Sequence, residues 1–395
     1  MHLAYLVAVL LWSVLWLRPL EASAQTAIAI GGALRFDHQA VWRRIVDEAG
    51  GPGARFAVFA TAAGNPARAA ERVIEALRAQ GADATLVPVA PALPGVNLQQ
   101  ELHRAENLAL VRRADGVFFT GGAQALIVDT LQPDGRPTEL LQAIWALYRR
   151  GGVIAGTSAG AAVLSTTMFR DAPDALQALR GGLREGREID RGLGFVGPAL
   201  LIDQHFLRRG RIGRLLPLMQ AKGYRVGLGV EENSAVVIKG SMLEVIGGKG
   251  ALLVDLGQAR HDPGMAQFNV RGALLSFLAP GDRHDLATGH SLPAARKLAG
   301  RRLLLEEAGP DPVRPPVVAD ILADNAIVAA MSSLLESPAR EAYGLAGAGI
   351  SPPGFEFRLY KTAATTAWQA EDADGDYTML RLGLDVRPLQ GTAAP

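Results

Sequence analysis

Short apolar runs that alternate with helical stretches are the feature of this sequence that most restricts its fold. Strand-like runs are predicted at 26–30, 56–60, 84–89, 117–120 and 152–155, with helices at 38–48, 66–80 and 139–150. Strands alternating with helices indicate an α/β fold, in which helices cover both faces of a mostly parallel sheet. Ligands bind such sheets at the carboxyl ends of the strands. Glycines mark three of these ends, at Gly31-Gly32, Gly121-Gly122 and Gly156, and we expect them to lie near one another.

Composition excludes several kinds of site. The net charge of +1 over 395 residues lacks the basic excess expected of a nucleic-acid-binding protein. Because the chain has no cysteine, it has neither disulfides nor thiolate metal sites, and it has no cysteine nucleophile. The pairs His261-Asp262 and His284-Asp285 lack the spacing of metal ligands. We therefore predict no metal site, no cofactor and no nucleic-acid partner.

The first two dozen residues differ from the rest. An apolar run spans residues 3–17, and the small residues Ala22-Ser23-Ala24 follow it as a cleavage signature. The run is shorter than the roughly 20 residues that a membrane-spanning helix needs. Residues 1–24 are therefore predicted to be a cleaved signal peptide. The mature protein is expected to be secreted or periplasmic, with no membrane partner after cleavage.

The motif Gly156-Thr157-Ser158-Ala159-Gly160 carries the sharpest chemical signal. It follows a short apolar strand and precedes a small-residue helix, which is the context of a G-x-S-x-G nucleophile elbow. Its tight turn presents the serine hydroxyl at a helix N-terminus, where backbone N–H groups stabilise a developing anion. Ser158 is therefore the candidate nucleophile. Glycine-rich turns of this kind also occur in α/β proteins without a catalytic serine.

A serine hydroxyl needs a base to remove its proton. The histidines after the predicted signal peptide are His38, His103, His205, His261, His284 and His290. Five stand in polar or loop-like sequence, whereas His205 follows the apolar run 197–202 at a predicted strand end, on the edge where Ser158 is expected. Two acids are candidates to orient it: Asp203, two residues away, and Glu232, at the end of another apolar run. The sequence pattern leaves both open. With Glu232 as the acid, the order Ser, His, acid differs from that of the α/β-hydrolases.

Arginines are concentrated directly after His205, at Arg208, Arg209, Arg211 and Arg214. Such a run is usually a solvated helix face. Here it adjoins the candidate base, and clustered guanidiniums bind carboxylates or phosphates through paired hydrogen bonds. The run therefore favours an acidic substrate.

Four blocks together resemble the cyanophycinases of the peptidase E-like serine peptidase family. They are F-F-T-G-G-A-Q at 118–124, G-T-S-A-G-A-A at 156–162, D-Q-H-F-L-R-R-G-R-I-G-R at 203–214 and G-V-E-E-N-S-A at 229–235. The segment L-A-P-G-D-R-H-D-L at 278–286 is similar to the closing strand of the family. Ala123 departs from the family pattern, which has Asn or Asp there, and the charged stretch 170–191 is expected to enlarge a loop over the site.

The resemblance implies a fold similar to the class I glutamine amidotransferases and a catalytic triad of Ser158, His205 and Glu232. It assigns the oxyanion hole to the backbone amides of Gly122 and Ala159. It also assigns substrate binding to a set of polar side chains, namely Gln124, Asp203, Gln204, Arg209, Arg211 and Arg214.

The implied activity is that of an exported serine exopeptidase. Its substrate would be cyanophycin, a poly-aspartate with arginine on each β-carboxyl group, and its products would be β-Asp-Arg dipeptides released through an acyl-enzyme. The family tendency implies a homodimer. Two alternatives remain: a dipeptidase or isoaspartyl hydrolase acting on small acidic peptides, and a non-catalytic exported binding protein that keeps the fold.

The pattern changes in the second half of the chain. Short apolar runs between 226 and 254 predict β-hairpins appended to the sheet. A proline-rich stretch over 309–316 is typical of a linker. Beyond it we expect a helix over 317–335 and strands over 355–384, with Asp374-Gly375 as a hairpin turn. The predicted division is a catalytic domain at 25–298, a linker at 299–316 and a C-terminal extension at 317–395.

Overall fold

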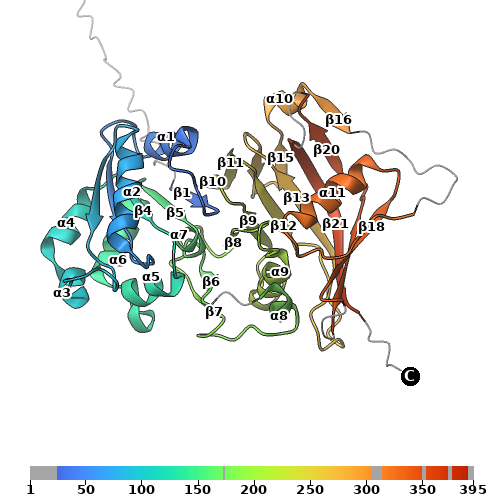
Figure 1. Ribbon diagram of the computed structural model, residues 1–395, viewed down its shortest axis with the longest axis horizontal. Helices are drawn as coiled ribbons and strands as arrows, with labels where there is room; N and C mark the ends of the chain where they lie inside the picture. The colour runs from blue at the N-terminus through green and yellow to red at the C-terminus, as the bar shows by residue number, and fades with distance from the viewer. Residues whose placement is uncertain (1–24, 172–173, 304–313, 349–352, 372–375, 390–395) are drawn as a thin grey trace, which may run out of the picture.

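Two large β-sheets form the framework of the chain (Figure 1). The computed structural model describes residues 25–171, 174–303, 314–348, 353–371 and 376–389. The predicted signal peptide, part of the predicted linker and the expected turn at Asp374-Gly375 lie outside the described residues.

The first sheet has nine strands in the order β15-β14-β11-β10-β1-β5-β4-β2-β3. The strands are β1 (Thr26–Ile30), β2 (Arg55–Phe59), β3 (Asp83–Val87), β4 (Gly116–Phe119), β5 (Val153–Thr157), β10 (Ser234–Lys239), β11 (Met242–Gly247), β14 (Arg283–Asp285) and β15 (His290–Leu292). All pairings among β1 to β5 are parallel, so their carboxyl ends meet at one edge. The remaining strands extend the sheet antiparallel beside β1.

Helices cover both faces of this sheet, as the alternating pattern predicts. One layer contains α1 (Gln39–Glu48) and α2 (Pro66–Arg78). The other contains α3 (Leu98–His103), α4 (Ala105–Arg113), α5 (Gln124–Leu131), α6 (Glu139–Arg149) and α7 (Ala159–Ala162). Alternate residues of β1 face opposite layers: Ile28 packs with α1 and α2, whereas Ala27 packs with the other helices. The predicted α/β fold is confirmed. Among the described residues, no helix is long and apolar enough to cross a membrane.

The second sheet contains ten strands and follows the order β17-β18-β19-β21-β13-β12-β9-β8, with β20 pairing to β21 and β16 to β20. These strands are β8 (Leu200–Gln204), β9 (Val226–Val230), β12 (Ala251–Asp255), β13 (Val270–Leu278), β16 (Arg301–Leu303), β17 (Val317–Val318), β18 (Glu341–Ala346), β19 (Phe355–Tyr360), β20 (Thr366–Gln369) and β21 (Tyr377–Pro388). The smaller elements are β6 (Thr167–Phe169), β7 (Ile189–Arg191), α8 (Ala175–Leu179) and α10 (Ala295–Leu298). Two further helices, α9 (Ile212–Lys222) and α11 (Ala326–Glu336), pack in the core of this sheet.

The C-terminal extension continues this second sheet. Its strand β21 pairs antiparallel with β13, which belongs to the region 25–298. A buried ion pair reinforces the junction: the Lys297 ammonium contacts the Asp282 carboxylate at 2.8 Å and the Thr378 hydroxyl at 3.0 Å. Figure 1 shows the red C-terminal strands beside the yellow strand β13 at the right of the molecule. The extension therefore shares a sheet and a hydrophobic core with the rest of the chain.

The helix predicted over 317–335 is shorter in the structure. Helix α11 begins at Ala326, because Val317 and Val318 pair with β18 and the residues up to Asn325 contact the loop after His205. The strands predicted over 355–384 are present as β19, β20 and β21. The apolar pattern of residues 317–325 predicts a helix, but their tertiary contacts impose a different conformation.

Candidate active site

Ser158 lies in the turn between β5 and α7 with φ 53° and ψ −112°. A side-chain-bearing residue rarely adopts these angles, which a nucleophile elbow requires. The two glycines of the motif are needed because the backbone leaves no room for a side chain at either position. A Cβ on Gly156 would lie 2.1 Å from the Gly160 carbonyl oxygen, and a Cβ on Gly160 would lie 2.3 Å from that of Phe119. Only glycine allows the strand and helix to approach this closely.

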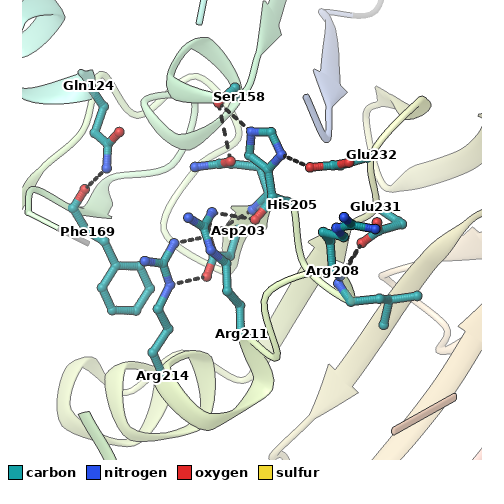
Figure 2. A network of polar contacts seen from close by, with 12 residues as sticks. Gln124, Ser158, Phe169, Asp203, His205, Arg208, Arg211, Arg214, Glu231 and Glu232 are labelled. Atoms are coloured by element: carbon teal, nitrogen blue, oxygen red, sulfur yellow. Dashed lines mark hydrogen bonds and ion pairs between the residues drawn. The ribbon is translucent and has the colours of Figure 1, made fainter. Parts of the chain in front are cut away.

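A line of hydrogen bonds connects Ser158, His205 and Glu232 (Figure 2). The Ser158 hydroxyl lies 2.9 Å from His205 Nε2, and His205 Nδ1 lies 2.6 Å from Glu232 Oε1. Of the two acids that the sequence pattern left open, Glu232 contacts the imidazole, whereas Asp203 points into a separate buried cluster. The geometry is that of a nucleophile, a base and the carboxylate that orients the base.

The carboxyl end of β1 binds the three segments that carry Ser158, His205 and Glu232. The backbone N–H groups of Ser158, His205 and Asn233 donate to the consecutive carbonyls of Ile30, Gly31 and Gly32, at 3.0, 2.7 and 2.9 Å. Gly32 also gives the imidazole its space, because a Cβ there would lie 2.3 Å from the His205 ring. The glycine-marked strand end predicted at 31–32 thus lies beside the one at Gly156.

The two amides expected to form the oxyanion hole are those of Ala159 and Gly122. Ala159 is the first residue of α7, so its N–H has no acceptor within the helix. Gly121 approaches the serine so closely that a Cβ on it would lie 3.1 Å from Ser158 Cβ. The next residue, Gly122, has φ +141°, and a Cβ on it would lie 1.8 Å from the Ala62 carbonyl oxygen. This loop therefore requires glycine at position 122, and a side chain at position 121 would press against Ser158.

The imidazole of His205 is in an environment that favours its neutral form. Burial lowers its pKa below the ordinary value, the hydrogen bond to Glu232 opposes this shift, and the positive charges of Arg209 and Arg211 add to it. A neutral imidazole at neutral pH is able to take the proton of Ser158. His205 itself adopts φ 46°, so base and nucleophile both have left-handed backbone angles.

Three of the side chains predicted to bind substrate pair with one another in a buried ionic cluster. Arg214 makes two hydrogen bonds to the Asp203 carboxylate, at 2.6 and 2.7 Å. Arg211 lies 3.4 Å from the same carboxylate and donates to the Gln204 carbonyl at 2.5 Å. The side chains of Asp203, Arg211 and Arg214 are at most 5% exposed. These paired charges connect β8 to the start of α9.

The other predicted binding residues differ in exposure. Gln124, at the start of α5, is buried and donates to the Phe169 carbonyl, while the Arg214 guanidinium lies 4.2 Å from the centre of the Phe169 ring (Figure 2). The Gln204 side-chain oxygen is 3.4 Å from the Ser158 hydroxyl. Arg209 is exposed. Of the predicted set, Arg209 is thus the guanidinium that solvent reaches.

One buried acid beside the triad escaped the sequence reasoning. The Glu231 carboxylate accepts hydrogen bonds from the backbone N–H groups of Leu207 and Arg208. The available signal was the doublet Glu231-Glu232 at a strand end, where neighbouring side chains point to opposite sides. Within the described part of the chain, no group of three or more His, Cys, Asp or Glu is placed to hold a metal ion.

A serine, histidine and carboxylate aligned at the strand ends of an α/β sheet, with a helix N-terminus at the serine, define a serine-type hydrolase. The chain belongs to peptidase family S51, whose model matches residues 28–246. It is 27% identical over 291 residues to a cyanophycinase of Trichormus variabilis, which covers 72% of this chain and 93% of that protein. It is 29% identical over 277 residues to a cyanophycinase of Geminocystis herdmanii, covering 67% of this chain and 94% of that protein.

Among solved structures, the chain is similar to a peptidase from an acI-B1 Actinobacterium. The TM-score is 0.49 and the identity 20%, over 67% of this chain and 98% of that one. Family membership and the curated relatives make this chain a serine-type peptidase, and the predicted resemblance to cyanophycinases is confirmed.

Proposed function

We propose that this chain is an exported serine exopeptidase that hydrolyses cyanophycin to β-Asp-Arg dipeptides through an acyl-enzyme. The observation that carries the proposal is the hydrogen-bonded line from Ser158 through His205 to Glu232. The similarity to curated cyanophycinases supports the substrate. Export and a homodimeric state come from the sequence expectations and belong to the same proposal.

The proposed reaction gives each of these groups a role. His205 Nε2 takes the proton of Ser158 as the Oγ atom attacks the scissile carbonyl carbon. The N–H groups of Gly122 and Ala159 stabilise the negative oxygen of the tetrahedral intermediate. The intermediate collapses when the leaving amine receives the proton from His205, and the acyl group stays on Ser158. Water then attacks the ester, with His205 again as base, and restores the serine.

The burial of Arg211 and Arg214 keeps a second candidate function open. The arginine run favoured an acidic substrate in the sequence reasoning, but in this structure both guanidiniums point toward Asp203. With both charges paired, the cluster gives no preference for a polymer over the alternative, a hydrolase for short acidic or isoaspartyl peptides. This hydrolase is therefore the second candidate, and Arg209 is the exposed charge that either substrate would meet.

Incubation of the chain from Gln25 onward with insoluble cyanophycin tests the proposal. Release of β-Asp-Arg is followed by mass spectrometry, with Ser158→Ala as the inactive variant and the exposed Ser333→Ala as a matched control. Release by the wild type and Ser333→Ala, but not by Ser158→Ala, is the expected result. If no protein releases the dipeptide while isoaspartyl peptides are cleaved, the second candidate replaces the first.

A further inference from the structure

The loop 206–211, which directly follows His205, is held on one side by Glu231. The Glu231 side chain is fully buried. Its Oε2 atom accepts hydrogen bonds from the backbone N–H of Leu207 at 2.6 Å and of Arg208 at 3.1 Å. Charge-assisted hydrogen bonds of this kind are strong, so they anchor the loop to the end of β9.

Residues 321–325 of the C-terminal extension contact the same loop from another side. The backbone N–H of Asn325 donates to the Leu207 carbonyl at 3.1 Å. The Arg208 guanidinium pairs with the Asp324 carboxylate at 2.8 Å. The peptide units around Leu207 are therefore hydrogen-bonded to two segments that are distant in the sequence.

The backbones of the two segments also touch directly. Gly210 has φ +54°, and a Cβ on it would lie 2.0 Å from the Leu322 carbonyl oxygen. A Cβ on Gly213 would lie 3.0 Å from the end of the Leu322 side chain. At Gly210 the obstacle is backbone, so any other residue has to move the loop or the segment.

The contacting segment is itself fixed in place. Asn325 adopts φ 58° and precedes α11, whose residues Ile327, Met331 and Leu334 are buried in the core of the second sheet. Closely packed cores transmit displacement rather than absorb it. The segment also lies outside the residues 28–246 that match the family model.

We propose that residues 321–325 are a positioning element for His205: together with Glu231 they fix the loop 206–211 and so keep the imidazole within reach of Ser158. The inference rests on the proposed function, because it concerns His205 as the base. His205 has a backbone conformation that persists only where its surroundings over-determine it. Its N–H is held by Gly31, and its carbonyl accepts from the Arg209 N–H at 3.2 Å, within the loop.

A pair of glycine variants separates positioning from general stability. Gly210→Ala forces the loop away from Leu322, whereas Gly223→Ala introduces a Cβ at a similar positive φ with no heavy atom within 4 Å. The rate at which a fluorophosphonate labels Ser158 is measured for both, together with their thermal melting. In this reaction the serine oxygen bonds to phosphorus, fluoride leaves and His205 takes the proton.

We expect labelling of Gly210→Ala to be about tenfold or more slower than that of Gly223→Ala at a temperature where both are folded, because a small displacement of a base costs large factors in rate. Equal labelling rates would overturn the inference. If Gly210→Ala does not fold, Leu322→Ala takes its place. Slower labelling in Leu322→Ala, together with a normal rate in Leu322→Met, supports the positioning role. An unchanged labelling rate in Leu322→Ala contradicts it.

A second measurement keeps this inference separate from the proposed function. If the wild type does not react with the fluorophosphonate, the serine-hydrolase mechanism fails, and NMR titration of the His205 imidazole decides the positioning. The charged groups that act on this imidazole are Glu232, Arg209 and Arg211. A different titration in Gly210→Ala than in Gly223→Ala supports positioning, and identical titrations overturn it.

Discussion

Replacing Asp203 by asparagine tests whether the buried ionic cluster supports the protein or binds its substrate. The substitution keeps the shape of the side chain but removes the charge that the guanidiniums of Arg214 and Arg211 share. Removing one partner of a buried ion pair costs about 3–5 kcal/mol, because the other charge is left uncompensated. For a chain of 395 residues such a loss lowers the melting temperature by about 4–6 °C. The exposed Arg209→Gln is the control, with an expected stability change within about 0.5 kcal/mol.

The pH dependence of the same variant gives an independent check. Burial by itself would raise the pKa of the Asp203 carboxyl, but the charges of Arg214 and Arg211 hold it below the ordinary value. A carboxyl with a lowered pKa in the folded state stabilises the protein above its unfolded pKa, and this contribution is lost as the pH falls through the folded pKa. The melting temperatures of wild type and Asp203→Asn should therefore converge in acid. An unchanged melting temperature at neutral pH, with KM raised more than about tenfold, would refute the structural role and restore substrate binding.

Two further predictions concern the base and the junction with the C-terminal extension. Burial lowers the pKa of His205, and the positive charges of Arg209 and Arg211 lower it further, although the hydrogen bond to Glu232 opposes the shift. The acid limb of the kcat/KM profile should therefore lie below about pH 6.5. In Arg209→Gln it should move to higher pH; no movement, or movement to lower pH, would contradict this electrostatic account. Lys297→Met removes the partner of the buried Asp282 carboxylate and should lower the free energy of unfolding by about 3–5 kcal/mol in urea titrations, whereas a change below about 1 kcal/mol would show that the pair adds little.

Local patterns in the sequence predicted the parallel strands and three of the helices in the first half of the fold, but not α3, α4 and α5. The strand predicted at 26–30 and the helix predicted from residue 66 begin where expected, and the Asn65 side chain caps that helix by accepting from the Arg68 N–H at 3.1 Å. These features depend on neighbouring residues, whose hydrophobic period and capping preferences are visible in the sequence. The nucleophile elbow is equally local, and its glycines occupy the positions that sterics demand.

The direction of the arginines depends on partners from other elements. Arg214 points inward because Asp203 on β8 and the Phe169 ring on β6 receive it. The packing that brings β8 and β6 to α9 is not encoded in the arginine run at 208–214. By composition this run is typical of a solvated helix face. A buried, fully paired guanidinium and an exposed one have the same sequence signature, so the sequence could not show which of these arginines are buried.

The backbone of β1 explains how two rare backbone conformations coexist in this site. The left-handed angles of Ser158 and His205 each cost on the order of 1–3 kcal/mol. Both residues donate their N–H to adjacent carbonyls, Ile30 and Gly31, so one rigid strand end fixes nucleophile and base relative to each other. Beyond His205, however, the chain turns away from the end of β1 and enters the loop 206–211. Accurate placement of the base thus needs a second support, which Glu231 supplies from within the family-matched region and residues 321–325 from outside it.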